Sequence, residues 1–283
     1  MPRLLLLAFV AALLAPAALA QTASETRRVV LANGTVLVGT VADETADPVV
    51  VVTRDGVEQR VPRAQVVEIT PLIDGRFFRV DPTRTRLVLS PTGRTLGRGR
   101  TRVGTLVYIV PNATYGVSDR VDVSGTAFFA FGDEFAFAPV LGGKVGLVDT
   151  GSFAAAVGTN VGFAFADGGG GALVTPYAAV TAGSELRSVS ASVTGFIGGE
   201  IGGDFEAADG VLLAFGGEAQ VNNGVKLLVD VLATAGEGDD GVAVLPGVRL
   251  FGDRYSVDVF GAIGVAGGEV GGFAPFANFA FTF

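Results

Sequence analysis

The chain has 283 residues, a formal net charge of −8, 42 glycines and 21 phenylalanines, and it contains no cysteine, histidine or tryptophan. Without histidine and cysteine, the Ser-His-Asp triad, cysteine nucleophiles, thiolate zinc sites and imidazole metal sites are excluded, and we expect neither an enzyme nor a cofactor. Carboxylate-based hydrolysis and calcium binding stay open.

Hydrophobic residues make up 49% of the chain and the mean hydropathy is +0.52. Yet no apolar run after residue 20 approaches the roughly 18 residues that a transmembrane helix needs. Short Gly-, Val- and Phe-rich runs broken by Asp, Gly and Asn predict an all-β protein. Such a chain buries its apolar surface in a core or presents it to lipid along strands.

Residues 1–20 have the features of a cleaved signal peptide. Arg3 precedes an apolar stretch from Leu4 to about Leu14, Pro16 breaks that stretch, and Ala18-Leu19-Ala20 fits the small-x-small rule for cleavage before Gln21. An uncleaved membrane anchor is the alternative. We expect export across the inner membrane.

Residues 27–72 read as a small β-domain of five short strands. Two of its turns are Asn33-Gly34 and Asp55-Gly56, which favour tight hairpins. The patterns NG-x-x-x-x-G-x-V and DG-x-x-x-x-V-P resemble small SH3-like β-domains of exported bacterial proteins. We expect a spacer or assembly element in the periplasm, with peptidoglycan or a periplasmic protein as alternative partners.

Residues 73–83 read as a linker, and charge is divided unevenly around it. Residues 21–102 contain 13 Arg against 9 Asp or Glu, a net of +4, whereas residues 103–283 contain 6 Lys or Arg against 19 Asp or Glu, a net of −13. Arginine is densest at Arg94, Arg98, Arg100 and Arg102. Because exported proteins rarely meet nucleic acid, we expect contact with anionic lipid headgroups or with acidic neighbours in the fold.

Residues 84–283 are predicted to form an antiparallel transmembrane β-barrel of about twelve strands, with ten to fourteen as the range. Alternating apolar and polar residues place one apolar face on each strand. Alternate connections are tight turns, which are periplasmic in outer-membrane barrels. The expected strands are 84–90, 102–117, 121–131, 135–148, 152–166, 172–182, 186–198, 211–221, 224–235, 242–251, 255–266 and 272–283.

The inward face of this barrel carries small residues and a few charges. A wet, narrow lumen and a lumen closed by side-chain packing both fit this pattern. If charges meet inside, Lys144 and Lys226 against Glu218 and Asp230 form the expected polar network, for which a structural role is favoured over an ion-selective one.

The last strand carries Phe279, Phe281 and Phe283 on one face, and the chain ends on an aromatic residue. This resembles the terminal strand of bacterial outer-membrane proteins, where a C-terminal Phe is the family's assembly signal. The resemblance implies outer-membrane lipid and the barrel-assembly machinery as partners.

The stretch RLVLSPTGRTL at residues 86–96, followed by YGVSD at residues 115–119, is similar to segments of uncharacterised outer-membrane barrels of Bacteroidetes-like bacteria. The resemblance implies a location in the cell outer membrane, with the N-terminal domain in the periplasm, and no functional residues. We expect a porin-like, non-enzymatic barrel that is either a narrow pore or a structural protein. The rivals are an enzyme in the barrel wall and a secreted or surface-attached soluble β-protein that binds a ligand.

Overall fold

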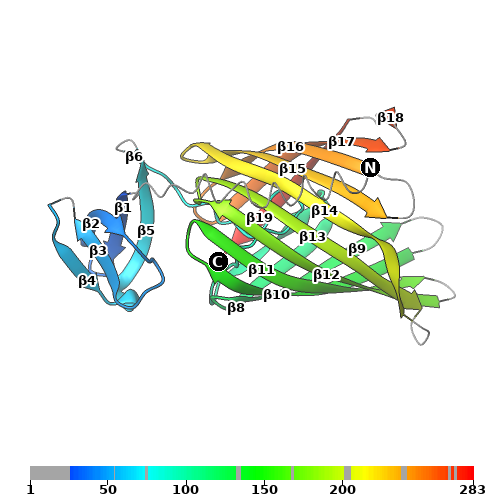
Figure 1. The fold of residues 1–283 in the computed structure, drawn as a ribbon, viewed down its shortest axis with the longest axis horizontal. Coiled ribbons are helices and arrows are strands. Elements are labelled where there is room, and N and C mark those ends of the chain that lie inside the picture. Colours follow the sequence, from blue (N-terminus) through cyan, green and yellow to red (C-terminus); the bar gives the residue numbers. More distant parts are fainter. Residues whose placement is uncertain are drawn as a thin grey trace.

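A computed structural model describes residues 26–53, 55–73, 76–131, 135–166, 169–200, 205–236, 241–266, 269–270 and 273–283. The expected signal peptide, residues 1–20, lies outside them. In the part of the chain that is described, no helix is long and apolar enough to cross a membrane. The described residues form a small β-sheet domain and a large β-barrel (Figure 1).

The small domain is an antiparallel sheet in the order β4-β3-β2-β1-β5-β6. Gly34 and Gly56 both adopt φ +83°, the left-handed geometry that the two predicted hairpin turns require. Five valines form the buried core. The five predicted strands are present, and the SH3-like assignment of this sheet stays a prediction. The elements are β1 (Thr26–Leu31), β2 (Val36–Val41), β3 (Val49–Thr53), β4 (Glu58–Val61), the 3-10 helix η1 (Arg63–Gln65), β5 (Val66–Ile73) and the short β6 (Arg76–Phe77).

Twelve strands of the described chain close into an antiparallel barrel, as predicted. Each strand pairs with its neighbour in sequence, and the last strand, β19, closes the barrel by pairing with both β17 and the first strand, β7. The strands are β7 (Thr101–Leu106), β8 (Val110–Ser118), β9 (Val121–Phe131), β10 (Phe135–Asp149), β11 (Phe153–Ala166), β12 (Gly169–Gly183), β13 (Arg187–Glu200), β14 (Phe205–Asn222), β15 (Val225–Gly236), β16 (Gly241–Phe251), β17 (Tyr255–Ala266) and β19 (Ala274–Thr282), with β18 (Glu269–Val270) as a two-residue addition beside β17.

The number of strands is right although two of the predicted strands are wrong. Residues 84–90 are not in the barrel sheet, so the barrel begins at Thr101 and not at residue 84. The predicted strand 102–117 is two strands, β7 and β8, because the chain reverses at Val107 and Tyr108, both with positive φ. The two errors cancel in the total.

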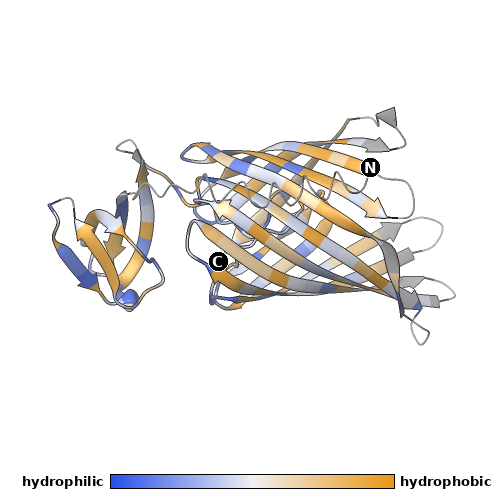
Figure 2. Cartoon of the chain, viewed as in Figure 1, coloured by the Kyte–Doolittle hydropathy of each residue, from blue (hydrophilic) through white to orange (hydrophobic). Residues whose placement is uncertain are grey.

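Apolar residues recur along every long strand of the wall (Figure 2). The side chains buried inside the barrel are of three kinds, charged, hydroxyl-bearing and apolar. On β15, Leu227 and Val229 are exposed whereas the alternating Lys226 and Asp230 are buried. Successive strand side chains point to opposite faces, so the charged residues face the lumen.

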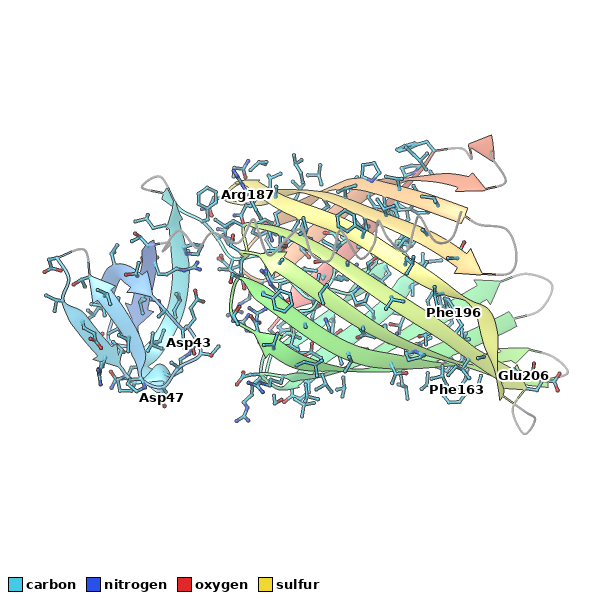
Figure 3. The ribbon with its side chains drawn as sticks, viewed as in Figure 1. Asp43, Asp47, Phe163, Arg187, Phe196 and Glu206 are labelled. Carbon is cyan, nitrogen blue, oxygen red and sulfur yellow. The ribbon has the colours of Figure 1, made fainter. Side chains whose placement is uncertain are left out.

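The two ends of the barrel differ in what they carry. Arg187, at the start of β13, lies at the end beside the small domain, whereas Phe163, Phe196 and Glu206 lie toward the other end (Figure 3). The tight turns after β8, β10, β12, β14 and β16 lie at the first end, here called the turn end.

Residues 79–100, here called the plug segment, occupy the lumen at the turn end. Arg79 enters beside the turns around Asn223 and Asp253, and the segment leaves beside the turn around Asp119. In between it folds back on itself at the isolated bridge between Arg86 and Pro91. The fold therefore places a basic, irregular segment where an open pore would have its lumen.

Candidate functional site

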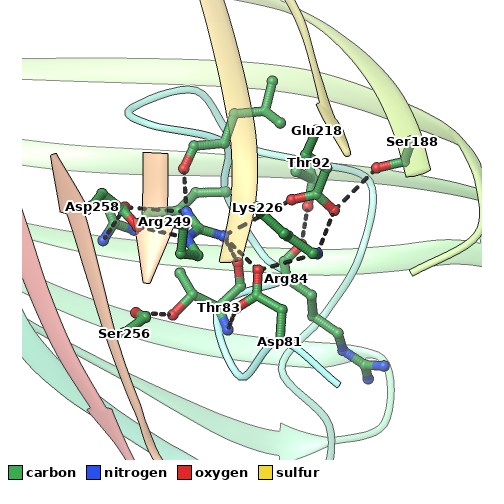
Figure 4. Close-up of polar contacts among 12 residues, drawn as sticks. Asp81, Thr83, Arg84, Thr92, Ser188, Glu218, Lys226, Arg249, Ser256 and Asp258 are labelled. Carbon is green, nitrogen blue, oxygen red and sulfur yellow. Dashed lines mark hydrogen bonds and ion pairs between the residues drawn. The ribbon is translucent and has the colours of Figure 1, made fainter. Parts of the chain in front are cut away.

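Arg249, on β16, is the centre of the contacts between wall and plug segment, and its side chain is fully buried. Its Nη1 donates to a carboxylate oxygen of Asp81 at 2.8 Å and to the carbonyl oxygen of Thr83 at 2.6 Å, and its Nη2 donates to the carbonyl of Leu87 at 2.8 Å. The same guanidinium pairs with Asp258 on the adjacent strand β17 (Figure 4). One side chain thus ties two wall strands to three positions of the plug segment.

Lys226, on β15, extends this cluster to a second carboxylate. Its Nζ lies 3.2 Å from Asp81 and 3.0 Å from Glu218 on β14, and Ser188 donates to Glu218 at 3.1 Å. Asp81 therefore sits between two cations from the wall. Breaking a buried ion pair from one side is strongly destabilising, since it leaves an uncompensated charge, so this arrangement fixes the plug segment.

The charge on Asp81 is maintained by these partners. Burial alone would raise the pKa of Asp81, but Arg249 and Lys226 outweigh burial and hold the pKa well below its usual range. The opposite balance applies to Arg86, whose burial lowers its pKa to about 10 in spite of Asp258 at 3.6 Å. Both groups are charged at neutral pH.

Asp230 holds the tip of the plug segment. Its carboxylate accepts hydrogen bonds from the backbone N–H groups of Leu89 and Ser90, both at 2.9 Å, and from the Ser90 hydroxyl at 2.7 Å. Beside this tip, Val88 packs with Leu228, Leu245 and Phe260 from the wall. The tip is thus fixed by a carboxylate on one side and by apolar packing on the other.

On the opposite side of the lumen, Lys144 holds both halves of the plug segment and Asp122 holds the returning half. Lys144 Nζ donates to the carbonyl oxygens of Thr85 at 3.2 Å and Arg94 at 2.6 Å, and Asp122 accepts from the backbone N–H of Leu96 at 3.0 Å. In these contacts the wall binds through its side chains, and the plug segment binds mainly through its backbone N–H and carbonyl groups.

Close backbone contact also seats the segment. A Cβ on Gly93 would lie 2.3 Å from the carbonyl oxygen of Ala154 on β11, a separation that real Cβ atoms do not show. Glycine at this position lets the plug segment lie directly on the wall. The Gly93 N–H then donates to the Thr181 hydroxyl at 2.9 Å.

The four residues predicted as a lumen network all face the lumen, but the structure brings only two of them together. Glu218 and Lys226 form an ion pair, whereas Asp230 and Lys144 each bind plug backbone and do not pair with the other two among the described contacts. Sequence reasoning missed three further members, Asp81, Arg249 and Asp258. The missed signal is a pair of opposite charges on the lumen face of adjacent strands, since Arg249 and Asp258 are register partners.

A cavity of about 380 Å³ lies in the lumen against the plug segment. Thr85, Arg86, Leu89 and Pro91 line it from the plug segment, and Arg102, Asp122 and Lys144 contribute charge from the wall. The remaining lining combines apolar side chains with hydroxyl and amide ones. The apolar residues are Leu106, Phe128, Val140 and Leu173, and the polar ones are Asn112, Thr114, Ser124, Thr126, Asn160, Thr175, Tyr177 and Thr194.

The three C-terminal phenylalanines lie together on the outer face of the barrel. Phe279, Phe281 and Phe283 are 43%, 55% and 68% exposed. The backbone of Phe283 exchanges two hydrogen bonds with that of Thr101, at 2.8 and 3.1 Å, so the last residue lies on the seam where the barrel closes.

The sequence matches no protein-family model and no curated protein. Among solved structures, the chain is similar to a KdgM porin in complex with disordered oligogalacturonate, at 10% identity, and to a KdgM porin, at 9% identity. Both similarities have a TM-score of 0.46 and cover 65% of this chain and 98% of the other. Nothing about the ligand or mechanism of this chain follows from them.

The geometry itself is that of an outer-membrane barrel. The pairing of β7 with β19 closes the wall, so that each of its twelve strands has a partner on both sides. The apolar exterior suits contact with lipid. The chain is therefore a twelve-stranded β-barrel protein of the outer-membrane type, and a secreted soluble β-protein is not favoured.

Proposed function

We propose that this protein is an outer-membrane channel that its own plug segment holds closed. The observation that carries the proposal is the buried pairing of Asp81 with Arg249 at 2.8 Å and Lys226 at 3.2 Å. These contacts fix the segment across the lumen at the turn end, so passage requires that it move.

The balance of charges on the inner face of the wall is compatible with a water-filled lumen once the plug segment has left it. Among the described residues of the barrel strands, the buried charged side chains are four cations and four carboxylates, so their formal charges cancel. An emptied lumen would expose these groups to water and would not leave a large excess of one sign. They are Arg102, Lys144, Lys226 and Arg249 against Asp122, Glu218, Asp230 and Asp258.

The orientation is part of the proposal. In an even-stranded barrel both chain ends lie on one side, and short turns at that side are typical of the periplasm. The small domain joins the plug segment at the turn end, so we place this domain in the periplasm. There it would contact peptidoglycan or a periplasmic protein, and movement of the domain would act directly on the plug segment.

The remaining parts of the proposal concern partners and chemistry. The apolar exterior would contact outer-membrane lipid, and the exposed Phe279, Phe281 and Phe283 would serve the barrel-assembly machinery as its signal. The role is non-enzymatic, because the buried wall carboxylates bind the plug segment or neighbouring cations. The likeness of residues 86–96 and 115–119 to barrels of Bacteroidetes-like bacteria stays a prediction.

Conductance in planar bilayers tests this function. We expect the full protein to be nearly silent and a variant with residues 80–98 replaced by a Gly-Ser linker of equal length to conduct steadily. A variant that lacks the small domain but keeps residues 78–283 is the matched control and should stay silent. Equal steady conductance of the full protein and the linker variant would refute a closed channel, and silence of a correctly folded linker variant would favour a structural barrel.

A further inference from the structure

The cavity beside the plug segment has an excess of positive charge. Arg86, Arg102 and Lys144 line it, whereas Asp122 is the one carboxylate in the described lining. Because Arg86 also lies 3.6 Å from Asp258 outside the lining, one positive charge is left without a counter-charge. Both carboxylate oxygens of Asp122 accept a hydrogen bond from the backbone N–H of Leu96, at 3.0 and 3.1 Å.

Two of these cations have no ion-pair partner among the described residues. Arg102 donates to the hydroxyls of Thr85 at 2.6 Å and Thr114 at 3.3 Å, and its Nε is buried without a partner. Lys144 donates to two backbone carbonyls. By contrast, Arg249 and Lys226 each pair with carboxylates.

Buried charge without a counter-charge is costly, and Arg102 and Lys144 are 5% and 7% exposed. The cavity offers the space that a counter-charge needs, since its volume of about 380 Å³ falls in the range of small-molecule sites. The hydroxyl and amide groups around it supply further donors. The two cations share one carboxylate nearby, Asp122, which is the register partner of Lys144, so a solute anion would balance the remaining positive charge.

We propose that this cavity binds a small oxyanion, a carboxylate or a phosphate group, through Arg102 and Lys144, with Arg86 of the plug segment as a third cation. Thr85 contacts both Arg102 and Lys144, so the site is complete only while the plug segment is in place. A ligand that binds one state only stabilises that state by mass action. The oxyanion therefore strengthens closure of the lumen.

Isothermal titration calorimetry of the full protein in detergent tests this site, with inorganic phosphate and citrate as probes at constant ionic strength against chloride. We expect saturable binding of at least one probe to the wild type. Arg102→Gln should weaken it at least tenfold, the effect of losing about 1.4 kcal/mol from one charged contact. Arg120→Gln, at an exposed turn, is the matched control and should bind as the wild type does.

The two probes separate the sources of the shared chemistry. Binding of citrate alone assigns a carboxylate ligand and binding of phosphate alone assigns a phosphate ligand. Absence of saturable binding by the wild type, or wild-type affinity in Arg102→Gln, would overturn the proposal. If Arg102→Gln does not fold, Lys144→Gln replaces it with the same expectation. Conductance tests the channel and calorimetry tests the anion site, so the two proposals fail separately.

Discussion

Asp81→Asn should loosen the plug segment while leaving the barrel wall unchanged. Asp81 is the only carboxylate in the sequence of residues 79–100, and it is 1% exposed between Arg249 and Lys226. Breaking a buried ion pair from one side costs about 3–5 kcal/mol. Both cations keep a second carboxylate, Asp258 and Glu218, so we expect a cost near the lower limit. About 3 kcal/mol changes the ratio of released to inserted plug segment roughly 150-fold.

A cysteine at the tip of the plug segment reports this ratio. The chain has no native cysteine, and Val88 is fully buried against Leu228, Leu245 and Phe260, so Val88→Cys gives a single protected thiol of similar size. When opening is fast and labelling slow, the rate of maleimide labelling follows the population of the open form. Adding Asp81→Asn to this background should raise the labelling rate by the same factor, roughly 150-fold.

Asp253→Asn is the matched control for Asp81→Asn. Asp253 also pairs with an arginine of the plug segment, Arg79, but its side chain is 79% exposed, where an ion pair contributes about 0–1 kcal/mol. Its labelling rate should therefore rise about fivefold at most. If both variants label at the same rate, the buried pairing of Asp81 is not what holds the segment.

Three further measurements follow from the same contacts. The pKa of Asp81 in the folded protein lies below its ordinary value of about 4, so the stability that its ion pairs contribute is complete above that pH and is lost only as the pH falls through the folded pKa. Bilayer conductance should therefore stay low from pH 7 to pH 4. An opening transition near pH 5 would contradict this. Gly93→Ala forces its Cβ against the backbone of β11 and, at about 1–3 kcal/mol for overpacking, should speed labelling of the Val88→Cys thiol roughly 5- to 150-fold. Gly143→Ala, where a Cβ meets open space, should leave the rate unchanged. Deleting Phe283 should abolish the heat-modifiable form in the outer-membrane fraction, whereas Phe273→Ala, also exposed, should not, and equal yields would reject Phe283 as an assembly signal.

The barrel could be predicted from the sequence because strand alternation has a period of two wherever one face meets lipid and the other the lumen. The reversal at Val107 and Tyr108 could not, because residues 106–110 read LVYIV, an unbroken apolar run. Non-glycine residues rarely adopt positive φ. Here tertiary contacts support it, since Val107 N–H donates to the Asn278 side chain and Tyr108 N–H to the carbonyl of Ala277.

Within the plug segment, the sequence predicts a strand over residues 84–90 for a related reason. Residues 87–89 are Leu-Val-Leu, a short apolar run that fits a strand or any segment packed on several sides. In the structure Leu87 and Val88 are both buried, because the wall surrounds the segment. The inward positions of Lys144, Glu218, Lys226 and Asp230 followed from alternation. Their partners did not, because Asp81 and Arg249 are 168 residues apart in sequence.

The path of residues 79–100 also bears on how the protein can be assembled. The segment enters near Arg79 and leaves near Arg98 at the same mouth of the barrel, with its tip at Ser90 deep inside. A chain that ran from one mouth to the other would have to be threaded before the strands closed. A loop with both ends at one mouth does not need to be inserted before the strands close. It can enter a finished barrel, or leave one, without any strand pair opening. Insertion of the loop and closure of β7 on β19 are topologically independent events.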